Sequence, residues 1–331
     1  MAKYSVNMLV LCSVSLFSSL ICPATGYSID SRGRSNSALS ELEMDLTAFR
    51  STVPVATAAE LAVVEDISQA FTEGYNPDPD STELSASDGV IDKNVFTGNN
   101  RRKVTSAQYP WRAIGRLSVP RGVCTASLVG NDLILTNAHC VVDKSSHTIT
   151  DWNILFLPNY TNGKSAYSSE VIRGWWSEKD DWAILRLAKP LGKTLGWLGI
   201  RVLPNPRNTS LFAVGYSTDF DNGLSASYEE GCKITSGLTS YDRLFHNCSN
   251  SRGASGSPLF RFEEKNEKKI PYIIALHAAE LRYDGDSTYA GVEYSDDKAN
   301  LAVPAARFSK DLIELSKVVP PAAAKTSMGA R

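Results

Sequence analysis

Three short segments of the chain carry a histidine, an aspartate and a serine in settings suited to nucleophilic catalysis. His139 ends an apolar run, Asp181 precedes the apolar run 182–187, and Ser255 lies in the glycine-containing turn 253–258. Acyl transfer by a serine needs a neighbouring imidazole, a carboxylate that fixes the tautomer of that imidazole, and N–H donors for an oxyanion. We therefore predict that Ser255 is a nucleophile activated by His139, which Asp181 orients.

The oxyanion donors and one competing acid lie in the same segments. The backbone N–H groups of Gly253 and Ser255 can point together at an oxyanion. Asp180 competes with Asp181 for the role of the acid, because the two differ by one residue in register. Each candidate alone has an ordinary interpretation as a turn or strand-end residue. The prediction depends on their joint occurrence.

The N-terminal 26 residues are typical of an export signal. Lys3 precedes a mostly apolar run from Met8 to Ile21, and the small residues Ala24 and Gly26 form a signal-peptidase site. The run is interrupted by serines and is shorter than the roughly 18 residues that a spanning helix needs. We expect a signal peptide over 1–26, no stable membrane anchor, and a secreted, extracellular protein.

Four cysteines remain after removal of this signal, and an even number in an oxidising compartment predicts two disulfides. Four cysteines allow three pairings, and the sequence alone does not choose among them. Neighbouring cysteines are separated by the same interval of 16 residues. The four are Cys124, Cys140, Cys232 and Cys248.

Residues 27–94 differ in composition from the rest of the chain. They contain 13 acidic and 4 basic residues, whereas residues 95–331 carry a net charge of about +6. We interpret 27–94 as an acidic propeptide that can dock on a basic domain. Apolar residues at helical spacing favour two amphipathic helices in it, with a disordered leader as the alternative. They are Leu39, Leu42, Leu46 and Phe49, then Leu61, Val64, Ile67 and Phe71.

From residue 112 onward, short apolar or alternating runs separated by turn residues predict an all-β barrel or sandwich. The proline- and glycine-containing stretch 189–206 is expected to cross to a second set of strands. A closing helix is predicted over 304–318, and 319–331 is expected to be a flexible tail. The expected strands are 112–119, 124–129, 133–136, 154–157, 182–187, 211–216, 258–262, 272–277 and 289–294.

At these motifs the chain resembles the chymotrypsin-like serine peptidases, specifically the glutamyl-endopeptidase branch with Gly-x-Ser-Gly-Ser-Pro around its nucleophile. The resemblance covers about 95–318. It implies two six-stranded antiparallel β-barrels with the site between them, a C-terminal helix, and the roles given above for His139, Asp181 and Ser255. The implied activity is that of a secreted, zymogen-derived serine endopeptidase that hydrolyses peptide bonds through an acyl-enzyme intermediate.

The resemblance also bears on activation. Trypsin-type members carry an aspartate before the nucleophile that binds the new N-terminus, but this chain has Ala254 there. The segment from Val95 resembles the mature start of glutamyl endopeptidases, whose valine ammonium helps to bind an acidic substrate side chain. We expect cleavage after Asn94, with the basic cluster Arg101–Lys103 as the second choice.

An expected preference for glutamate or aspartate depends on three substrate-binding candidates: Val95, Asn250 and His277. His277 resembles the specificity histidine of glutamyl endopeptidases, whereas Asn250 replaces their pocket threonine. Ser249 stands where trypsin-type members have the aspartate that binds basic substrates. Uncharged or basic specificity therefore remains the alternative.

Other functional classes fit less well. An α/β-hydrolase elbow requires glycine at position 257, where this chain has serine. A non-catalytic protease-fold binding protein would typically lack a triad member. The net charge of −2 argues against a nucleic-acid partner, and no ligand spacing suggests a metal or another cofactor. We expect a monomer whose partners are peptide or protein substrates and its own propeptide, and we assign no partner to His147 or His246.

Overall fold

The computed structural model describes residues 71–78, 96, 100–236, 242–280, 293–295 and 298–317. The expected signal peptide, the expected tail and most of the expected propeptide lie outside these residues. The one described residue of the two expected propeptide helices is Phe71. It lies in strand β1 (Phe71–Thr72), which pairs antiparallel with β9 (Gly199–Arg201). The helical prediction is wrong at Phe71, because pairing with a distant strand overrides the local apolar spacing.

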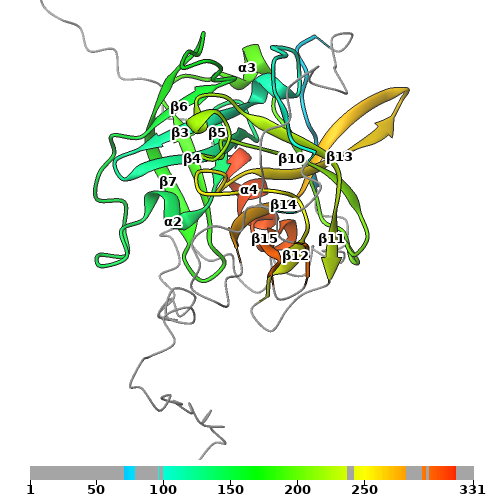
Figure 1. The fold of residues 1–331 in the computed structure, drawn as a ribbon. Helices are drawn as coiled ribbons and strands as arrows, with labels where there is room; N and C mark the ends of the chain where they lie inside the picture. Colours follow the sequence, from blue (N-terminus) through cyan, green and yellow to red (C-terminus); the bar gives the residue numbers. More distant parts are fainter. Residues whose placement is uncertain are drawn as a thin grey trace, which may run out of the picture. The chain divides into compact units, whose positions relative to one another are not determined.

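The first barrel, whose strands are drawn in teal and green in Figure 1, closes on itself in the strand order β3-β4-β5-β8-β7-β6. Every pairing between neighbouring strands in it is antiparallel. Its strands are β3 (Ile114–Val119), β4 (Gly122–Leu128), β5 (Leu133–Thr136), β6 (Leu155–Pro158), β7 (Ser169–Ser177) and β8 (Trp182–Leu187).

The second barrel closes where β14 pairs with β15, in the order β14-β13-β10-β11-β12-β15. All six of its pairings are antiparallel, whereas β9 extends the sheet by pairing parallel to β14. A short strand β2 (Arg102–Lys103) adds to β11. The strands are β10 (Ser210–Gly215), β11 (Ser227–Ser236), β12 (Leu244–His246), β13 (Pro258–Lys265), β14 (Lys268–Glu280) and β15 (Asn300–Pro304). The predicted all-β fold with two six-stranded barrels is confirmed.

Individual strands were predicted less completely than the architecture. Strands β7, β11, β12 and β15 had no predicted counterpart. Exposed or charged residues interrupt the apolar pattern of β7 and β11, whereas β12 and β15 are only three and five residues long. Of the expected strand 289–294, only Glu293 and Tyr294 are described, and neither lies in a strand. β13 and β14 form a hairpin in which Lys265 pairs with Lys268.

The barrels are connected through 188–209, as expected, and this connection contains α3 (Gly192–Leu195) and β9. The predicted closing helix is confirmed as η7 (Ala305–Arg307) followed by α4 (Ser309–Lys317), with Leu312 and Leu315 buried. Trp111 of η4 (Trp111–Ala113) precedes the first barrel but lies against Tyr228 and Phe260 of the second. The short helices α2 (Ala138–Val141) and η5 (Asp221–Gly223) complete the described elements.

The structure pairs the cysteines as Cys124–Cys140 and Cys232–Cys248, with Cα–Cα distances of 6.2 Å and 4.9 Å. One bridge therefore lies in each half of the domain. Among the residues that the structure describes, no helix is both long enough and apolar enough to cross a membrane.

The two disulfides are predicted to contribute equally to stability. Both close loops with a sequence separation of 16 residues, and the chain-entropy contribution depends on loop length, at about 3 kcal/mol for each bridge. Replacing either cysteine pair by serine should therefore lower the free energy of unfolding in denaturant by a similar amount. A difference of more than about 2 kcal/mol between the two variants would show that loop entropy is not the dominant effect.

Candidate active site

His139 and Asp181 form a hydrogen-bonded pair on the first barrel. His139 lies in α2, directly after β5, and Asp181 immediately precedes β8, the strand beside β5. The His139 Nδ1 atom lies 2.9 Å from Oδ2 and 3.0 Å from Oδ1 of Asp181. The His139 backbone N–H also donates to Asp181 Oδ1 at 3.0 Å. The carboxylate thus fixes both the ring and the backbone of the histidine.

The position of Asp181 is maintained by its surroundings. Its φ of 54° lies in the left-handed region, which is uncommon for a residue other than glycine. The Asn137 side-chain amide donates to the Asp181 carbonyl at 2.8 Å. Asp180 points elsewhere: it interacts with Ser177 and lies 3.8 Å from an Arg307 nitrogen. Of the two adjacent aspartates, only Asp181 contacts the histidine in the described part of the chain.

The pKa of His139 reflects opposing influences. Burial lowers it, and Lys144 lowers it slightly, but the charge of Asp181 and its hydrogen bond outweigh both effects. The net result is a pKa above the ordinary value for histidine. The carboxylate therefore stabilises the imidazolium form, as a general base requires after it has accepted a proton.

Ser255 lies in a tight turn before β13 whose backbone requires glycine on both sides. Gly253 has a φ of +94° and Gly256 a φ of +86°. A Cβ atom at Gly253 would lie 2.4 Å from the Tyr216 carbonyl oxygen, and one at Gly256 would lie 2.1 Å from that of Thr125. Any side chain at either position would displace the turn.

Thr125 of β4 connects this turn to the first barrel. Its N–H donates to the Ser255 carbonyl at 2.8 Å, and its hydroxyl donates to the Gly253 carbonyl at 3.1 Å. The hydroxyl also accepts a bond from the Tyr216 N–H at 3.0 Å. Thr125 is fully buried. The sequence analysis did not identify Thr125 as a site residue. The one local signal for it is its position directly after Cys124, a disulfide cysteine.

One further contact links the histidine segment to the serine segment. Cys140 Sγ lies 4.0 Å from the Ser255 carbonyl oxygen, and Cys140 is the neighbour of His139. In the described residues the His139 ring bonds to Asp181, and no bond joins it to the Ser255 hydroxyl. Such catalytic bonds are often long in ligand-free enzymes and shorten in the substrate complex.

The backbone N–H groups expected to bind an oxyanion are free to do so. Among the backbone hydrogen bonds of the described residues, none is donated by Gly253 or Ser255. Ala254 and Ser257 instead bond within the turn, to Ser251 and Ala254 carbonyls at 2.9 Å and 2.8 Å. The turn is thus closed by its own bonds while these two donors remain unused.

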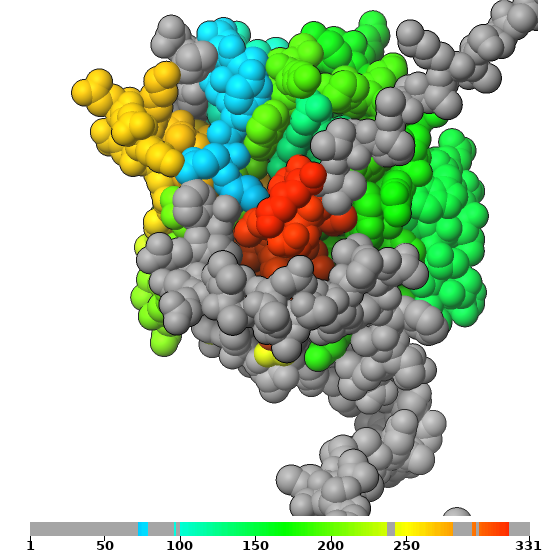
Figure 2. Space-filling view, turned by 180° about the vertical axis from the view of Figure 1, so that it is seen from behind, coloured from blue at the N-terminus to red at the C-terminus, as the bar shows by residue number. Residues whose placement is uncertain are grey.

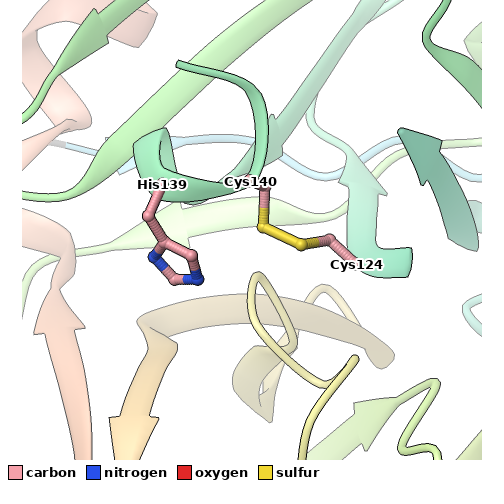
Figure 3. Close-up of side chains that lie close together, drawn as sticks. All are labelled: Cys124, His139 and Cys140. Atoms are coloured by element: carbon pink, nitrogen blue, oxygen red, sulfur yellow. A yellow bond between two sulfur atoms is a disulfide. The ribbon is translucent and has the colours of Figure 1, made fainter. Parts of the chain in front are cut away.

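Cys124, His139 and Cys140 are close enough to resemble a metal-ligand cluster, with ligand atoms within 4.8 Å of one another. Figure 3 shows why they do not form one: the two sulfurs are bonded to each other, and the His139 ring lies beside the bridge. Disulfide sulfurs are not thiolates, which are the form of cysteine that binds metal ions.

His277, a candidate specificity residue, is hydrogen-bonded to the turn that carries Ser255. The backbone of His277 exchanges hydrogen bonds with the serine turn, accepting from Gly256 at 3.0 Å and donating to Ser257 at 2.9 Å. His277 Nδ1 lies 3.1 Å from Nε2 of His246, to which no partner had been assigned. Burial, followed by the neighbouring imidazoles, keeps the pKa of His277 well below its ordinary value, so His277 is neutral.

Asn250 is also buried, and its Nδ2 atom has no hydrogen-bond partner in the described part of the chain. An amide donor of this kind is available to a substrate. Val95 lies outside the described residues. Its neighbour Phe96 is buried, with its ring 5.5 Å from that of Tyr294.

A buried carboxylate that sequence reasoning missed lies beside these residues. Glu229 of β11 is 7% exposed, and its Oε2 atom accepts a bond of 2.6 Å from the Ser249 N–H. Burial raises the pKa of Glu229, an effect only partly offset by Ser249 and Arg101. Glu229 and Ser249 line a pocket of about 200 Å³ together with Phe96 and Tyr294. Nothing in the local sequence marks Glu229.

Sequence comparisons agree with this geometry. A family profile described as a trypsin-like peptidase domain matches residues 124–266. A glutamyl endopeptidase from Bacillus licheniformis is 26% identical over 216 residues, covering 62% of this chain and 66% of that protein. Serine protease 23 from Bos taurus is 27% identical over 206 residues, covering 51% and 52%. The chain thus covers less than two thirds of either relative.

A solved structure titled "Structure of Glu endopeptidase in complex with MPD" superposes with a TM-score of 0.55 and 20% identity. The match covers 68% of this chain and 99% of that one. At this identity the likeness concerns the fold. The paired barrels, the trypsin-like peptidase-domain match over 124–266 and the sequence relatives support a chymotrypsin-like serine peptidase that resembles the glutamyl-endopeptidase branch.

Proposed function

We propose that the chain is a secreted serine endopeptidase in which His139, Asp181 and Ser255 are the catalytic residues. The observation that carries this proposal is the hydrogen-bonded His139–Asp181 pair on one barrel, held against the Ser255 turn of the other by Thr125. A structural histidine would not need an adjacent turn with two unused N–H donors. The trypsin-like domain match supports the same conclusion.

The proposed reaction proceeds through two acyl transfers. His139 removes the proton from the Ser255 hydroxyl as its oxygen attacks the scissile carbonyl, and the N–H groups of Gly253 and Ser255 bind the resulting oxyanion. The imidazolium, stabilised by Asp181, then protonates the departing amine. Water, deprotonated by His139, attacks the acyl-enzyme in the same way and releases the carboxylate product with Ser255 restored.

We further propose a preference for acidic side chains before the scissile bond. If His246 donates to Nδ1 of His277, the proton of neutral His277 is on Nε2, where it can bond to a carboxylate. The unpartnered amide of Asn250 provides a second donor. One of the sequence relatives is a glutamyl endopeptidase by name, which agrees with this preference.

Glu229 favours a second candidate specificity, for basic side chains. Its carboxylate bonds to the backbone of Ser249, the residue that stands where trypsin-type members have an aspartate. A buried negative charge there would oppose an acidic substrate and attract a basic one. The substrate preference therefore depends on whether Glu229 or the donors of His277 and Asn250 have the larger effect.

We infer that the active form begins at Val95 and that the enzyme acts as an extracellular monomer. The alternative cleavage cluster is built into the fold, which supports this choice. Arg101 is 1% exposed and forms two bonds to Asp219, and Lys103 lies in β2, paired with β11. Asp219 in turn accepts a bond from Ser251 of the nucleophile loop. N-terminal sequencing of the active protein distinguishes the two sites.

Ser255→Ala is predicted to abolish cleavage of a peptide library while leaving the fold intact. Loss of a triad nucleophile typically reduces turnover by about 10⁶-fold. The measurement is turnover with thermal unfolding as the control for folding. Cleavage by neither the parent protein nor the variant would instead favour a non-catalytic binding protein, and equal cleavage by both would place the nucleophile elsewhere.

Asp181→Asn should lower kcat about 10⁴-fold, whereas Asp180→Asn should have little effect. His139 must be neutral to accept a proton, so activity rises with pH through its pKa, which Asp181 raises. Loss of the carboxylate charge should therefore move the acidic limb of kcat/KM to lower pH in the residual activity. A larger loss in the Asp180 variant would reverse the assignment.

Glu229→Gln should increase the ratio of acidic to basic substrate cleavage. Two unit charges about 8 Å apart at an effective dielectric constant of about 20 interact by about 2 kcal/mol, so loss of the Glu229 charge should change the cleavage of each substrate by up to about 30-fold, in opposite directions for acidic and basic side chains. The exposed neighbour Glu230→Gln removes the same charge and is the matched control. Paired peptides that differ only in glutamate or lysine give the ratio, and an equal change in both variants would rule out a specific role for Glu229.

A further inference from the structure

Residues 71–78, here called the N-terminal segment, are packed on the second barrel. The segment lies on the surface between the β13–β14 hairpin and α4 (Figure 2), and β1 contacts α4. Phe71 and Thr72 pair antiparallel with Arg201 and Ile200. Further along, the Tyr75 N–H donates to the Trp197 carbonyl at 2.9 Å, and the Trp197 N–H donates back at 2.8 Å. The segment is therefore an added edge strand of the barrel sheet.

Side chains strengthen this pairing. The rings of Tyr75 and Trp197 lie 4.5 Å apart, and the Trp197 indole N–H donates to the Glu73 carbonyl at 3.0 Å. The Glu73 carboxylate accepts a bond of 2.6 Å from the Tyr272 hydroxyl and lies 2.5 Å from Lys265 Nζ. These are contacts of specific shape and chemistry rather than a diffuse attraction between an acidic segment and a basic domain.

The N-terminal segment also packs closely against the surface of the barrel. A Cβ atom at Gly74 would lie 3.0 Å from the Gly199 nitrogen, 3.0 Å from the Tyr109 hydroxyl and 3.1 Å from an Ile270 methyl carbon. A side chain at this position would require these neighbours to move by a few tenths of an ångström. By contrast, the Thr72 hydroxyl is buried with no hydrogen-bond partner in the described residues, so an apolar side chain of the same shape would be tolerated there.

None of the described contacts of the segment involves His139, Asp181 or Ser255. Its partners are β9, the β13–β14 hairpin, α4 and the region of Arg112, whose guanidinium lies 3.4 Å from Asn76 Oδ1. The active site can therefore open to substrate while the segment stays in place.

We propose that the N-terminal segment remains bound as a non-covalent strand of the mature enzyme after the chain is cut between residues 79 and 95. This enzyme's own propeptide is thus the partner of an interaction surface on the second barrel. That surface is formed by β9, Trp197, Tyr272 and Lys265. Strand addition to a sheet edge supplies main-chain hydrogen bonds, and side-chain pockets supply specificity. The mature enzyme consists of two chains without a covalent bond between them.

The test uses the full chain carrying Ser255→Ala and a recognition sequence for a site-specific protease inserted after Asn94. Because this protein is inactive, the outcome does not depend on the proposed catalytic function. After complete cutting at about 10 µM, we expect the fragment that contains residues 71–78 to co-elute 1:1 with the peptidase domain in gel filtration, as measured by mass spectrometry. Elution of the fragment alone would overturn the proposal.

Two valine substitutions provide matched variants. Gly74→Val should release the fragment after cutting, because its Cβ and two methyl groups would crowd Gly199 and the Tyr109 hydroxyl, whereas Thr72→Val should retain it. Equal retention in both would contradict the proposed docking. If Gly74→Val fails to accumulate as folded protein, Tyr75→Ala serves instead, with at least tenfold faster release of the fragment expected and unchanged release contradicting the proposal.

Salt separates strand docking from charge attraction. At 1 M salt the screening length is about 3 Å, so attraction between exposed charges is largely lost. Backbone pairing and the packing of Tyr75 on Trp197 are not screened in this way. We expect the fragment to stay bound in 1 M NaCl. Its complete release there would show that only the opposite net charges of propeptide and domain hold it.

Discussion

The arrangement of the active site depends on one close approach, between Thr125 of the first barrel and the Ser255 turn of the second. The Thr125 N–H and hydroxyl donate to the Ser255 and Gly253 carbonyls, and the Thr125 carbonyl leaves no room for a Cβ atom at Gly256. These bonds are buried, where an unpaired polar group is costly, so the relative position of the barrels is tightly fixed at this point. The adjacent disulfide to Cys140 extends the constraint to α2, which carries His139.

Burial and hydrogen-bond partners set the charge of the ionisable side chains near this contact between the barrels. Asp181 is compensated by the imidazole that it orients, and the proposed reaction uses the proton affinity that this gives to His139. Glu229 is buried with a backbone N–H as its hydrogen-bond partner and has a raised pKa. His277 and His246 are both neutral, since burial lowers the pKa of His246 to about 3. The proposed substrate pocket therefore combines neutral donors with one carboxylate.

The boundary of the folded domain does not follow composition. Acidic composition extends to residue 94, yet residues 71–78 already pair with β9 and contact α4. Composition reports average solubility and charge, whereas docking depends on a few contacts such as Glu73 with Lys265 and Tyr75 with Trp197. A segment can thus resemble a propeptide in composition and still form part of the sheet of the folded domain.

The sequence by itself predicted the proposed chemistry and the fold class. Acyl transfer requires few residue types in distinctive local settings, and short apolar or alternating runs with regular turns are typical of all-β barrels and sandwiches. His139, the Ser255 turn and the closing helix through Leu312 and Leu315 were predictable for that reason.

Only the tertiary structure shows which of Asp180 and Asp181 contacts His139, because adjacent residues differ in direction rather than in local pattern. It also decided the cysteine pairing, the contact of His246 with His277, and the contacts of Thr125, Glu229 and the N-terminal segment. Each of these depends on contacts between residues far apart in the chain. Local sequence carries no information about such contacts, because they arise only when both barrels have closed and packed against each other.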